Sequence, residues 1–183
     1  MHQDELWQEY NAAGEPLKNG GYPAALDNPQ PGSGKILGIA KTWLFRRTEN
    51  GPELLWQKRS PYIENGGLWD ISGGGHINYG ETPLQAAARE TAEEIGAEII
   101  PEKLLFGFVT NKINRFFWQY FYDYTDCPEN FHFDDAEVTE IQWVPVSKTD
   151  EFRHQFAKPG FATDDTYFAL LKNWLDGHLE PNQ

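Results

Sequence analysis

Residues Gly75–Ala97 read GHINYGETPLQAAARETAEEIGA, and the interpretation of the whole chain starts from this stretch. Thr82 is suited to cap a helix, Pro83 suits the first helical position, and Gln85 can reach back to the amide of the cap. Gly96 is a matching helix end. We therefore predict a helix between Thr82 and Gly96.

The predicted helix has two chemically different faces. At about 100° per residue, its apolar and small side chains gather on a core face that comprises Leu84, Ala88, Thr91, Ala92 and Ile95. Glu90, Glu93 and Glu94 gather on the other side. Carboxylates at this spacing repel one another, and a hard divalent cation would offset the repulsion. A solvated acidic face is the alternative, but the adjacent Arg89 and the glycines before the helix favour a metal site.

The same stretch resembles the Nudix box, G-x5-E-x7-R-E-U-x-E-E-x-G-U, in which U is an aliphatic residue. All charged and glycine positions of the pattern are matched, at Gly75, Glu81, Arg89, Glu90, Glu93, Glu94 and Gly96. The two aliphatic positions hold Thr91 and Ala97, which we interpret as a packing change that leaves the chemistry intact. The detailed match covers about an eighth of the chain, and a looser one extends over residues 35–146.

The resemblance implies an α/β fold, a Nudix-type α/β/α sandwich with a mixed central sheet. It also implies that water cleaves the diphosphate linkage of a nucleoside diphosphate derivative or a related organic diphosphate, with Mg²⁺ or Mn²⁺ as the cofactor. Glu90, Glu93 and Glu94 are then the expected metal ligands, together with the carbonyl group of Gly75. Arg89 is expected to orient the carboxylates, and a simple surface ion pair with Glu93 is its alternative role.

The general base is less narrowly defined, because members of the family place it differently. One of the three box glutamates could take the proton of the attacking water. Otherwise a carboxylate from a later loop does so, and Glu137 is the candidate, with Glu140 behind it. Glu81 is expected to support the loop or an outer metal.

Three further residues are candidates for contacting the substrate. Arg59 could hold a phosphate, or it could be an exposed basic residue like Lys58. His76 could donate to a phosphate, or it could be a structural histidine. Trp69 is expected to pack the floor of the site. Gly73–Gly75 are expected to form a loop with positive φ angles or a close backbone approach to a ligand.

Composition limits the class of protein. At 183 residues, we expect one domain over residues 1–183, in which residues 1–34 form an N-terminal hairpin and loop extension. The net charge of -13 opposes binding to nucleic acid polymers and anionic membranes. The lone Cys127 excludes an internal disulfide. Without a leader pattern or a long apolar run, a cytoplasmic protein is expected, and the family resemblance suggests a homodimer.

Alternation and turn residues predict the remaining elements. We expect a hairpin over residues 4–18, a loop over 19–34, strands over 35–47, 53–60, 104–110, 115–123 and 137–146, an acidic loop over 124–136, and a final helix from Asp164 to Gly177. The aromatic residues between Phe116 and Tyr122 must divide between two sheet faces, and some of them are expected to line the substrate cleft.

Two other functions compete with hydrolysis. Leu68–His76 resembles the segment of isopentenyl diphosphate isomerase that carries a catalytic cysteine, but Gly74 stands in the place of that cysteine and Cys127 lies far along the chain. A non-catalytic Nudix module that binds a nucleotide is the second alternative. The identity of the diphosphate substrate stays open.

Overall fold

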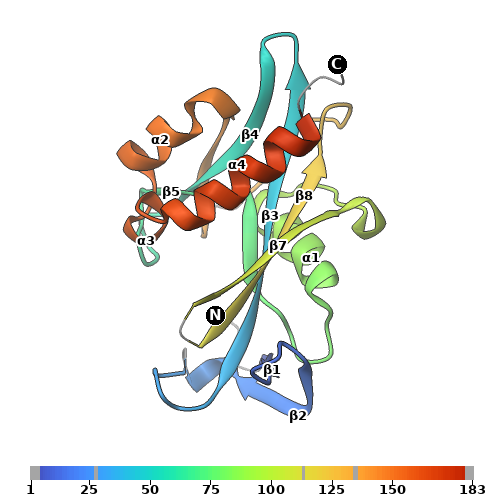
Figure 1. Cartoon of the computed structure of the whole chain (residues 1–183), viewed down its shortest axis with the longest axis vertical. Helices are drawn as coiled ribbons and strands as arrows, with labels where there is room; N and C mark the ends of the chain where they lie inside the picture. Colours follow the sequence, from blue (N-terminus) through green and yellow to red (C-terminus); the bar gives the residue numbers. More distant parts are fainter. Residues whose placement is uncertain (1–4, 27–28, 113, 134–135, 180–183) are drawn as a thin grey trace.

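A computed structural model of the chain describes residues 5–26, 29–112, 114–133 and 136–179. Some predicted segments lie partly outside the described residues. These are the start of the hairpin (Asp4), parts of the two loops (27–28 and 134–135), and Ile113 in the connection between the strands predicted over 104–110 and 115–123. The architecture is a curled mixed sheet with one helix on one face and three helices, which include the longest one, on the other (Figure 1). The α/β fold with a mixed sheet is thereby confirmed.

The strands follow in order as β1 (Leu6–Tyr10), β2 (Pro16–Pro23), β3 (Ile36–Thr48), β4 (Gly51–Arg59), β5 (Trp69–Asp70), β6 (Gly73–His76), β7 (Leu105–Lys112), β8 (Arg115–Asp123) and β9 (Val138–Pro145). The helices are α1 (Pro83–Ile95), α2 (Thr149–Phe156), α3 (Pro159–Ala162) and α4 (Asp165–Leu179). Short 3-10 turns are η1 (Ala24–Leu26), η2 (Pro101–Lys103) and η3 (Val146–Lys148).

Strand β3 is the hub of the sheet. It pairs antiparallel with β1, β4 and β6 and parallel with β8. β3 and β4 are paired only near their shared turn. Farther from the turn, β3 pairs with β6 and β4 pairs with β5, while the other edge of β4 pairs with β9. The segment β5–β6 therefore fills the place where the two long strands diverge.

Alternation along β3 feeds two separate cores. Trp43 and Phe45 face one side, where they pack with residues of α3 and α4. Ala40 and Leu44 face the other side, where they pack with α1. The aromatic side chains of β8 divide in the same way, because Phe121 lies in the first core and Tyr120 and Tyr122 lie in the second. The predicted division between the two faces is confirmed.

The signals at the two ends of α1 are confirmed. Thr82 Oγ1 accepts from the Gln85 amide at 3.3 Å, and the Thr82 amide donates to Gln85 Oε1 at 3.0 Å. Gly96 ends the helix with φ 68°. The predicted core face is partly wrong, since Ala92 is exposed while Ala86 and Ala87 are buried. Three consecutive alanines bring the helix backbone against the sheet, and Thr42 Oγ1 donates to the Ala87 carbonyl at 3.3 Å.

Three other expectations need correction, and one helix was not predicted. Gly73–Gly75 form strand β6 instead of a loop, and none of these glycines has a positive φ. The chain stays in β2 as far as Pro23, so only part of 19–34 is loop. Helix α4 continues through Gly177 to Leu179. The short helix α2, whose sequence TDEFRHQF is mostly polar, carries no apolar stripe long enough to predict it.

None of the described helices combines the length and the apolarity that are needed to cross a membrane.

Candidate active site

Arg89 is the centre of a charged network between α1 and the loop that precedes it. Its Nε and Nη2 donate to the two carboxylate oxygens of Glu81, at 3.0 and 2.9 Å. Nη2 also donates to the carbonyl oxygen of His76 at 3.0 Å. Such a bidentate pair fixes the guanidinium plane. Arg89 therefore ties the end of β6, the loop and the helix together, and Glu81 supports the loop as expected.

The remaining nitrogen of Arg89 holds two of the box carboxylates. Nη1 donates to Glu90 Oε1 at 2.8 Å and to Glu93 Oε2 at 2.9 Å. Glu93 is 55% exposed, whereas Glu90 is only 16% exposed. Burial raises the pKa of Glu90 to about 7, although Arg89 acts in the opposite direction. The expected orienting role of Arg89 agrees with these contacts.

Glu94 occupies a different environment on the next turn of the same face. Its Oε2 accepts from Gln57 Nε2 at 2.9 Å and from the Gly74 amide at 3.0 Å. Burial and, to a smaller extent, the nearby Glu90 carboxylate raise the pKa of Glu94 to about 8, although the hydrogen bond from Gln57 acts in the opposite direction. Within the described residues, Gln57 Oε1 is buried and has no hydrogen-bond partner. Glu94 is thus a buried carboxylate held by neutral donors.

The glycines of β6 let α1 approach the sheet. A Cβ on Gly75 would lie 2.5 Å from Glu90 Oε2, and a Cβ on Gly73 would lie 2.9 Å from the Cα of Thr91. The predicted close backbone approach is therefore made toward the helix. Gly75 pairs with Ala40 in the β3–β6 ladder on one side and lies next to Glu90 on the other.

The three box glutamates do not form one preassembled cluster. Among the residues that the structure describes, no three or more His, Cys, Asp or Glu side chains form a group that could hold a metal ion as they stand. Arg89 takes Glu90 and Glu93, and Glu94 turns toward Gly74 and Gln57. The donor set nevertheless fits a hard cation, because it offers buried carboxylates with raised pKa values and an unpaired amide oxygen, all of them oxygen donors.

Glu137 lies close enough to raise the pKa of Glu90. It immediately precedes β9, it is exposed, and its carbonyl oxygen accepts from the Ser60 amide at 2.8 Å. Glu140 instead pairs with Lys58 at 3.0 Å across the β4–β9 ladder. Of the two later carboxylates, the structure brings Glu137 to the site.

The three predicted substrate contacts are not gathered around the carboxylates. Arg59 donates to the Glu64 carbonyl at 2.9 Å and pairs with Asp70 at 3.4 Å. Trp69 is buried on the opposite face of the sheet, in the core beside α3 and α4. The His76 ring stacks on Trp7 at 3.7 Å, and burial together with Arg115 lowers the pKa of His76 to about 4. A neutral imidazole at this position offers no positive charge to a phosphate at neutral pH.

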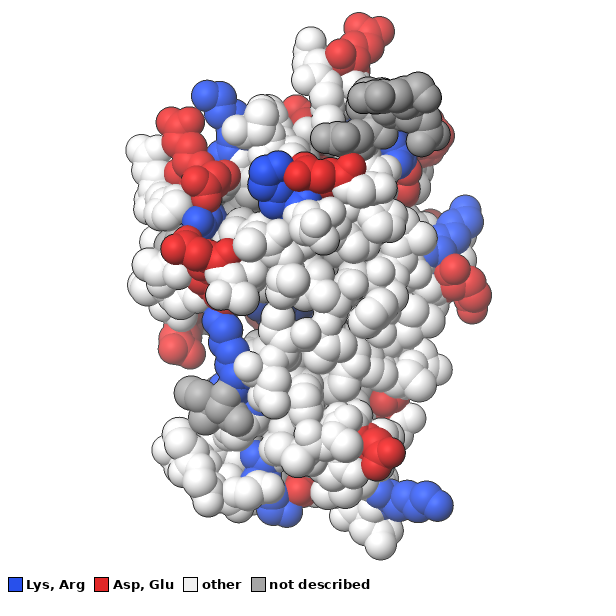
Figure 2. Space-filling view, in the orientation of Figure 1, with Lys and Arg blue, Asp and Glu red and all other residues white. Residues whose placement is uncertain are grey.

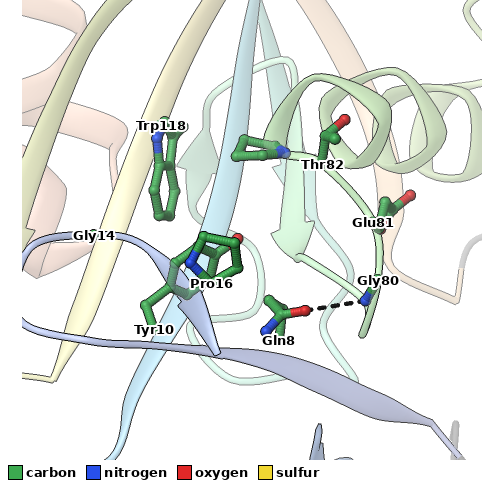
Figure 3. Close-up of a pocket in the computed structure, with 9 residues that line it drawn as sticks. Gln8, Tyr10, Gly14, Pro16, Gly80, Glu81, Thr82 and Trp118 are labelled. Carbon is green, nitrogen blue, oxygen red and sulfur yellow. Dashed lines mark hydrogen bonds between the residues drawn. The ribbon is translucent and has the colours of Figure 1, made fainter. Parts of the chain in front are cut away.

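The N-terminal hairpin holds the loop that carries Glu81. Gln8 is buried, and its Oε1 accepts from the Gly80 amide at 3.0 Å (Figure 3). The backbone also joins the two segments. The backbone amide of Gln8 donates to the Ile77 carbonyl at 2.8 Å, and the backbone amide of Tyr79 donates to the Leu6 carbonyl at 2.7 Å. A cavity of about 260 Å³ lies between hairpin and loop, with Tyr10 and Trp118 on one side of it and Glu81 on the other (Figure 3).

Sequence reasoning missed Gln57 and Gln8, the residues that position Glu94 and the loop. Gln57 stands in the largely apolar run ELLWQKRS, where a polar residue at an inward position is an available signal of a buried partner. For Gln8 the local sequence carries no such signal, because its partner in the loop, the Gly80 amide, lies about seventy residues away in the chain.

Comparisons with known proteins agree with this geometry. The model of the NUDIX domain family matches residues 40–164. Nudix hydrolase 3 of Arabidopsis thaliana is 33% identical over 129 residues, which are 63% of this chain and 16% of that protein. The chain therefore spans about a sixth of the length of this relative.

Two solved structures show the same fold at low sequence identity. DR0079 from Deinococcus radiodurans superposes with a TM-score of 0.68 at 20% identity, over 93% of this chain and 99% of that one. The NUDIX domain of Shewanella oneidensis NrtR, complexed with ADP ribose, superposes with a TM-score of 0.56 at 18% identity, over 82% and 96% of the two chains. This chain belongs to the Nudix family, a family of pyrophosphohydrolases.

Proposed function

We propose that this protein uses a divalent cation to hydrolyse the diphosphate linkage of a nucleoside diphosphate derivative or a related organic diphosphate. The main observation behind this proposal is the complete set of box carboxylates on one face of α1. Arg89 is hydrogen-bonded to Glu90 and Glu93, and Glu94 accepts a hydrogen bond from the Gly74 amide. A non-catalytic module has no need to retain every one of these groups.

In this proposal Glu90, Glu93, Glu94 and the carbonyl group of Gly75 hold Mg²⁺ or Mn²⁺. The bound cation neutralises the charge of the diphosphate and favours attack by water. Arg89 keeps Glu90 and Glu93 side by side, and it is fixed by Glu81. Gln57 and the Gly74 amide fix Glu94. Pre-positioned groups of this kind lower the cost of reorganisation during the reaction.

Glu137 is the group proposed to accept the proton of the attacking water. Its carboxylate makes no ion pair within the described part of the chain, and it acts electrostatically on Glu90. The box carboxylates are less suited, because cation binding occupies their oxygens. Replacing Glu137 with Gln should lower kcat by about 10²-fold or more while leaving cation binding intact.

The substrate class is supported by one relative. The Shewanella domain was solved with ADP ribose, which contains a diphosphate linkage. The present chain has a net charge of -13, so an anionic substrate needs compensating cations at the site. The homodimer that the family resemblance suggests stays a prediction, and light scattering of the purified protein tests it.

The test is hydrolysis of a panel of nucleoside diphosphate derivatives with Mg²⁺, followed by separation of the phosphate-containing products. Glu93→Gln and Glu94→Gln should each lower the rate by roughly 10²-fold or more, and a chelator should abolish it. Glu151→Gln, which removes the same charge from an exposed position on α2, is the matched control. Tight binding without turnover across the panel would instead identify a nucleotide-binding module.

A further inference from the structure

A second hollow lies on the face of the sheet opposite to α1. It has a volume of about 280 Å³, and its walls come from β3, β7, β8 and the segment from Lys158 to Tyr167. Three lysines and three aromatic rings characterise the lining: Lys41, Lys112, Lys158, Phe117, Phe161 and Tyr167. On this face the central surface is largely uncharged, and charged side chains gather toward its edges (Figure 2).

Lys41 brings a positive charge into this hollow. Its Nζ lies 5.0 Å from the centre of the Phe117 ring, 5.3 Å from that of Phe161 and 5.6 Å from that of Tyr167. Burial and the nearby Lys158 together lower the pKa of Lys41 to about 8, although Asp70 and Asp164 act in the opposite direction. Within the described residues, no carboxylate forms a salt bridge with this ammonium group. The rings offset only part of the cost of keeping the charge away from water.

The other two lysines are already paired. Lys112 forms an ion pair with Asp164, and Lys158 forms one with Asp70. Three lysines and two aspartates leave one net positive charge in a chain whose total charge is -13. The pocket therefore carries a local positive charge, which suits an anion.

The pocket is rigid at its centre. The Tyr167 hydroxyl accepts from Trp43 Nε1 at 2.8 Å and donates to Gln119 Oε1 at 2.5 Å. Gln119 Nε2 in turn donates to the carbonyl oxygen of Lys41 at 3.1 Å. These buried bonds hold the strand that carries Lys41 and one of the rings around its ammonium group.

The pocket also adjoins the carboxylate site. Lys41 is the partner of Gly74 in the β3–β6 ladder, and the amide of Gly74 donates to Glu94. Asp70, the partner of Lys158, is near enough to Glu94 to raise its pKa. The two sites thus share the β5–β6 segment, with the carboxylates on one side of Gly74 and the lysines on the other.

We propose that this pocket binds a phosphoryl group of the substrate other than the scissile diphosphate, with Lys41 as its main anchor. The inference rests on the proposed hydrolase function and narrows it to substrates that carry a further phosphate. A phosphoryl group suits an ammonium group that lacks a carboxylate partner, and the three rings accommodate the organic part that bears it.

The first test measures binding without metal, so that it does not depend on hydrolysis. Phenyl phosphate is titrated into the full chain in EDTA and followed by ¹H–¹⁵N NMR, with phenol as the uncharged control. We expect shifts at the amides of Phe117 and Gly160, binding at least about tenfold weaker in Lys41→Met, and recovery in Lys41→Arg. Lys172→Met, at an exposed position on α4, should bind like the wild type.

The second test asks whether the phosphoryl group belongs to the substrate. NADPH and NADH both contain a diphosphate linkage and differ by one phosphate, and kcat/KM is measured for both with Mg²⁺. We expect the wild type to prefer NADPH and Lys41→Met to lose about tenfold of that preference.

Each negative result has a distinct meaning. Equal binding of phenyl phosphate by the wild type and Lys41→Met, or absence of binding, overturns the proposal. Binding through Lys41 without any effect on the NADPH preference also overturns it, since the pocket then takes free phosphate. Failure of the hydrolase function itself shows separately, as absence of Mg²⁺-dependent turnover of both dinucleotides by a wild type that still binds phenyl phosphate through Lys41.

Discussion

Arg89 and Glu94 illustrate how single residues on one helix face acquire different roles. Arg89 uses all three guanidinium nitrogens on carboxylates of the box and its loop. Glu94, one turn beyond, has no cationic side chain among its hydrogen-bond partners and depends on Gln57 and Gly74. The pair therefore combines a fixed cation with a desolvated carboxylate that is costly to ionise.

The stability of the metal-free protein should fall as pH rises from 6.5 to 8. Burial raises the pKa of Glu90 from 4.5 to about 7 and that of Glu94 from 4.5 to about 8. The folded protein therefore retains protons that the unfolded chain has released, and stability decreases with pH in this range. His76, with its pKa lowered from 6.5 to about 4, has the opposite effect only below pH 6.5. Lys41, lowered from 10.5 to about 8, has the opposite effect only above pH 8.

Thermal unfolding in EDTA, followed by circular dichroism at several pH values, measures this effect. The Tm of the wild type should decrease across the window, and Glu94→Gln should flatten the decrease because it removes one of the two groups. A wild-type Tm that rises with pH between 6.5 and 8 would show that Glu90 and Glu94 are not desolvated as described.

At the scale of elements, the N-terminal hairpin supports the loop of the candidate site. It does so although it lies outside the matched family region, which begins at residue 40. β1 bonds to the loop before α1 through the Gln8 and Tyr79 amides, and Trp7 stacks on His76. The hairpin thereby fixes the position of Glu81 and, through it, of Arg89. Sequence reasoning predicted the hairpin itself, but its contacts join segments far apart in the chain.

Gln8→Ala should lower both stability and activity. The substitution removes the hydrogen bonds that the Gln8 side chain makes with the Gly80 amide and the Leu17 carbonyl, and each lost hydrogen bond costs about 0.5–1.5 kcal/mol. Urea unfolding and kcat/KM measure the two effects, with Gln142→Ala at an exposed position of β9 as the control. Wild-type kcat/KM in a folded Gln8→Ala protein would show that the hairpin does not support the candidate site.

Gly177 and Gly96 should respond to alanine in opposite directions. Gly177 lies inside α4, and a Cβ there meets no described atom within 4 Å, so Gly177→Ala should stabilise the protein by up to about 1 kcal/mol. Gly96 has φ 68° and a Cβ there would strike the ring of His132, so Gly96→Ala should destabilise it by at least about 1 kcal/mol. Chemical denaturation of both variants provides the comparison, and a destabilised Gly177→Ala would contradict the observed length of α4.

At the scale of the whole molecule, a chain of net charge -13 presents anions with an unfavourable field except where cations are concentrated. The curled sheet places two such regions back to back across β6. One is the carboxylate face of α1, where the proposed function supplies the cation, and the other is the lysine pocket beside α3 and α4. On the face that carries α4, the charged side chains lie mainly near the edges, and the centre of the face is mostly uncharged (Figure 2).

Mg²⁺ should stabilise the folded protein independently of any substrate. A ligand at about 100 times its Kd adds about 2.7 kcal/mol, which for a chain of this size raises the Tm by several degrees. We expect this shift in the wild type and in Glu151→Gln, and its loss in Glu94→Gln, by differential scanning calorimetry with Mg²⁺ or EDTA. An unchanged shift in Glu94→Gln would contradict the metal assignment.

The sequence by itself determined α1, its caps, the box residues and the order of most strands. These features follow from side-chain spacing, capping chemistry and turn residues, which act over a few positions and are visible in a local stretch. The same local rules failed where packing overrode them, as at Gly73–Gly75, which form a strand because α1 must lie close against it.

Only the tertiary structure decided which side chains meet. It separated Glu94 from Glu90 and Glu93, removed Trp69 to the other face, and brought Gln57, Gln8 and Lys41 to their sites. The physical reason is that burial and hydrogen bonding are set by partners from distant strands, here through the divergence of β3 from β4 around the β5–β6 segment. No spacing within one stretch of sequence encodes those distances.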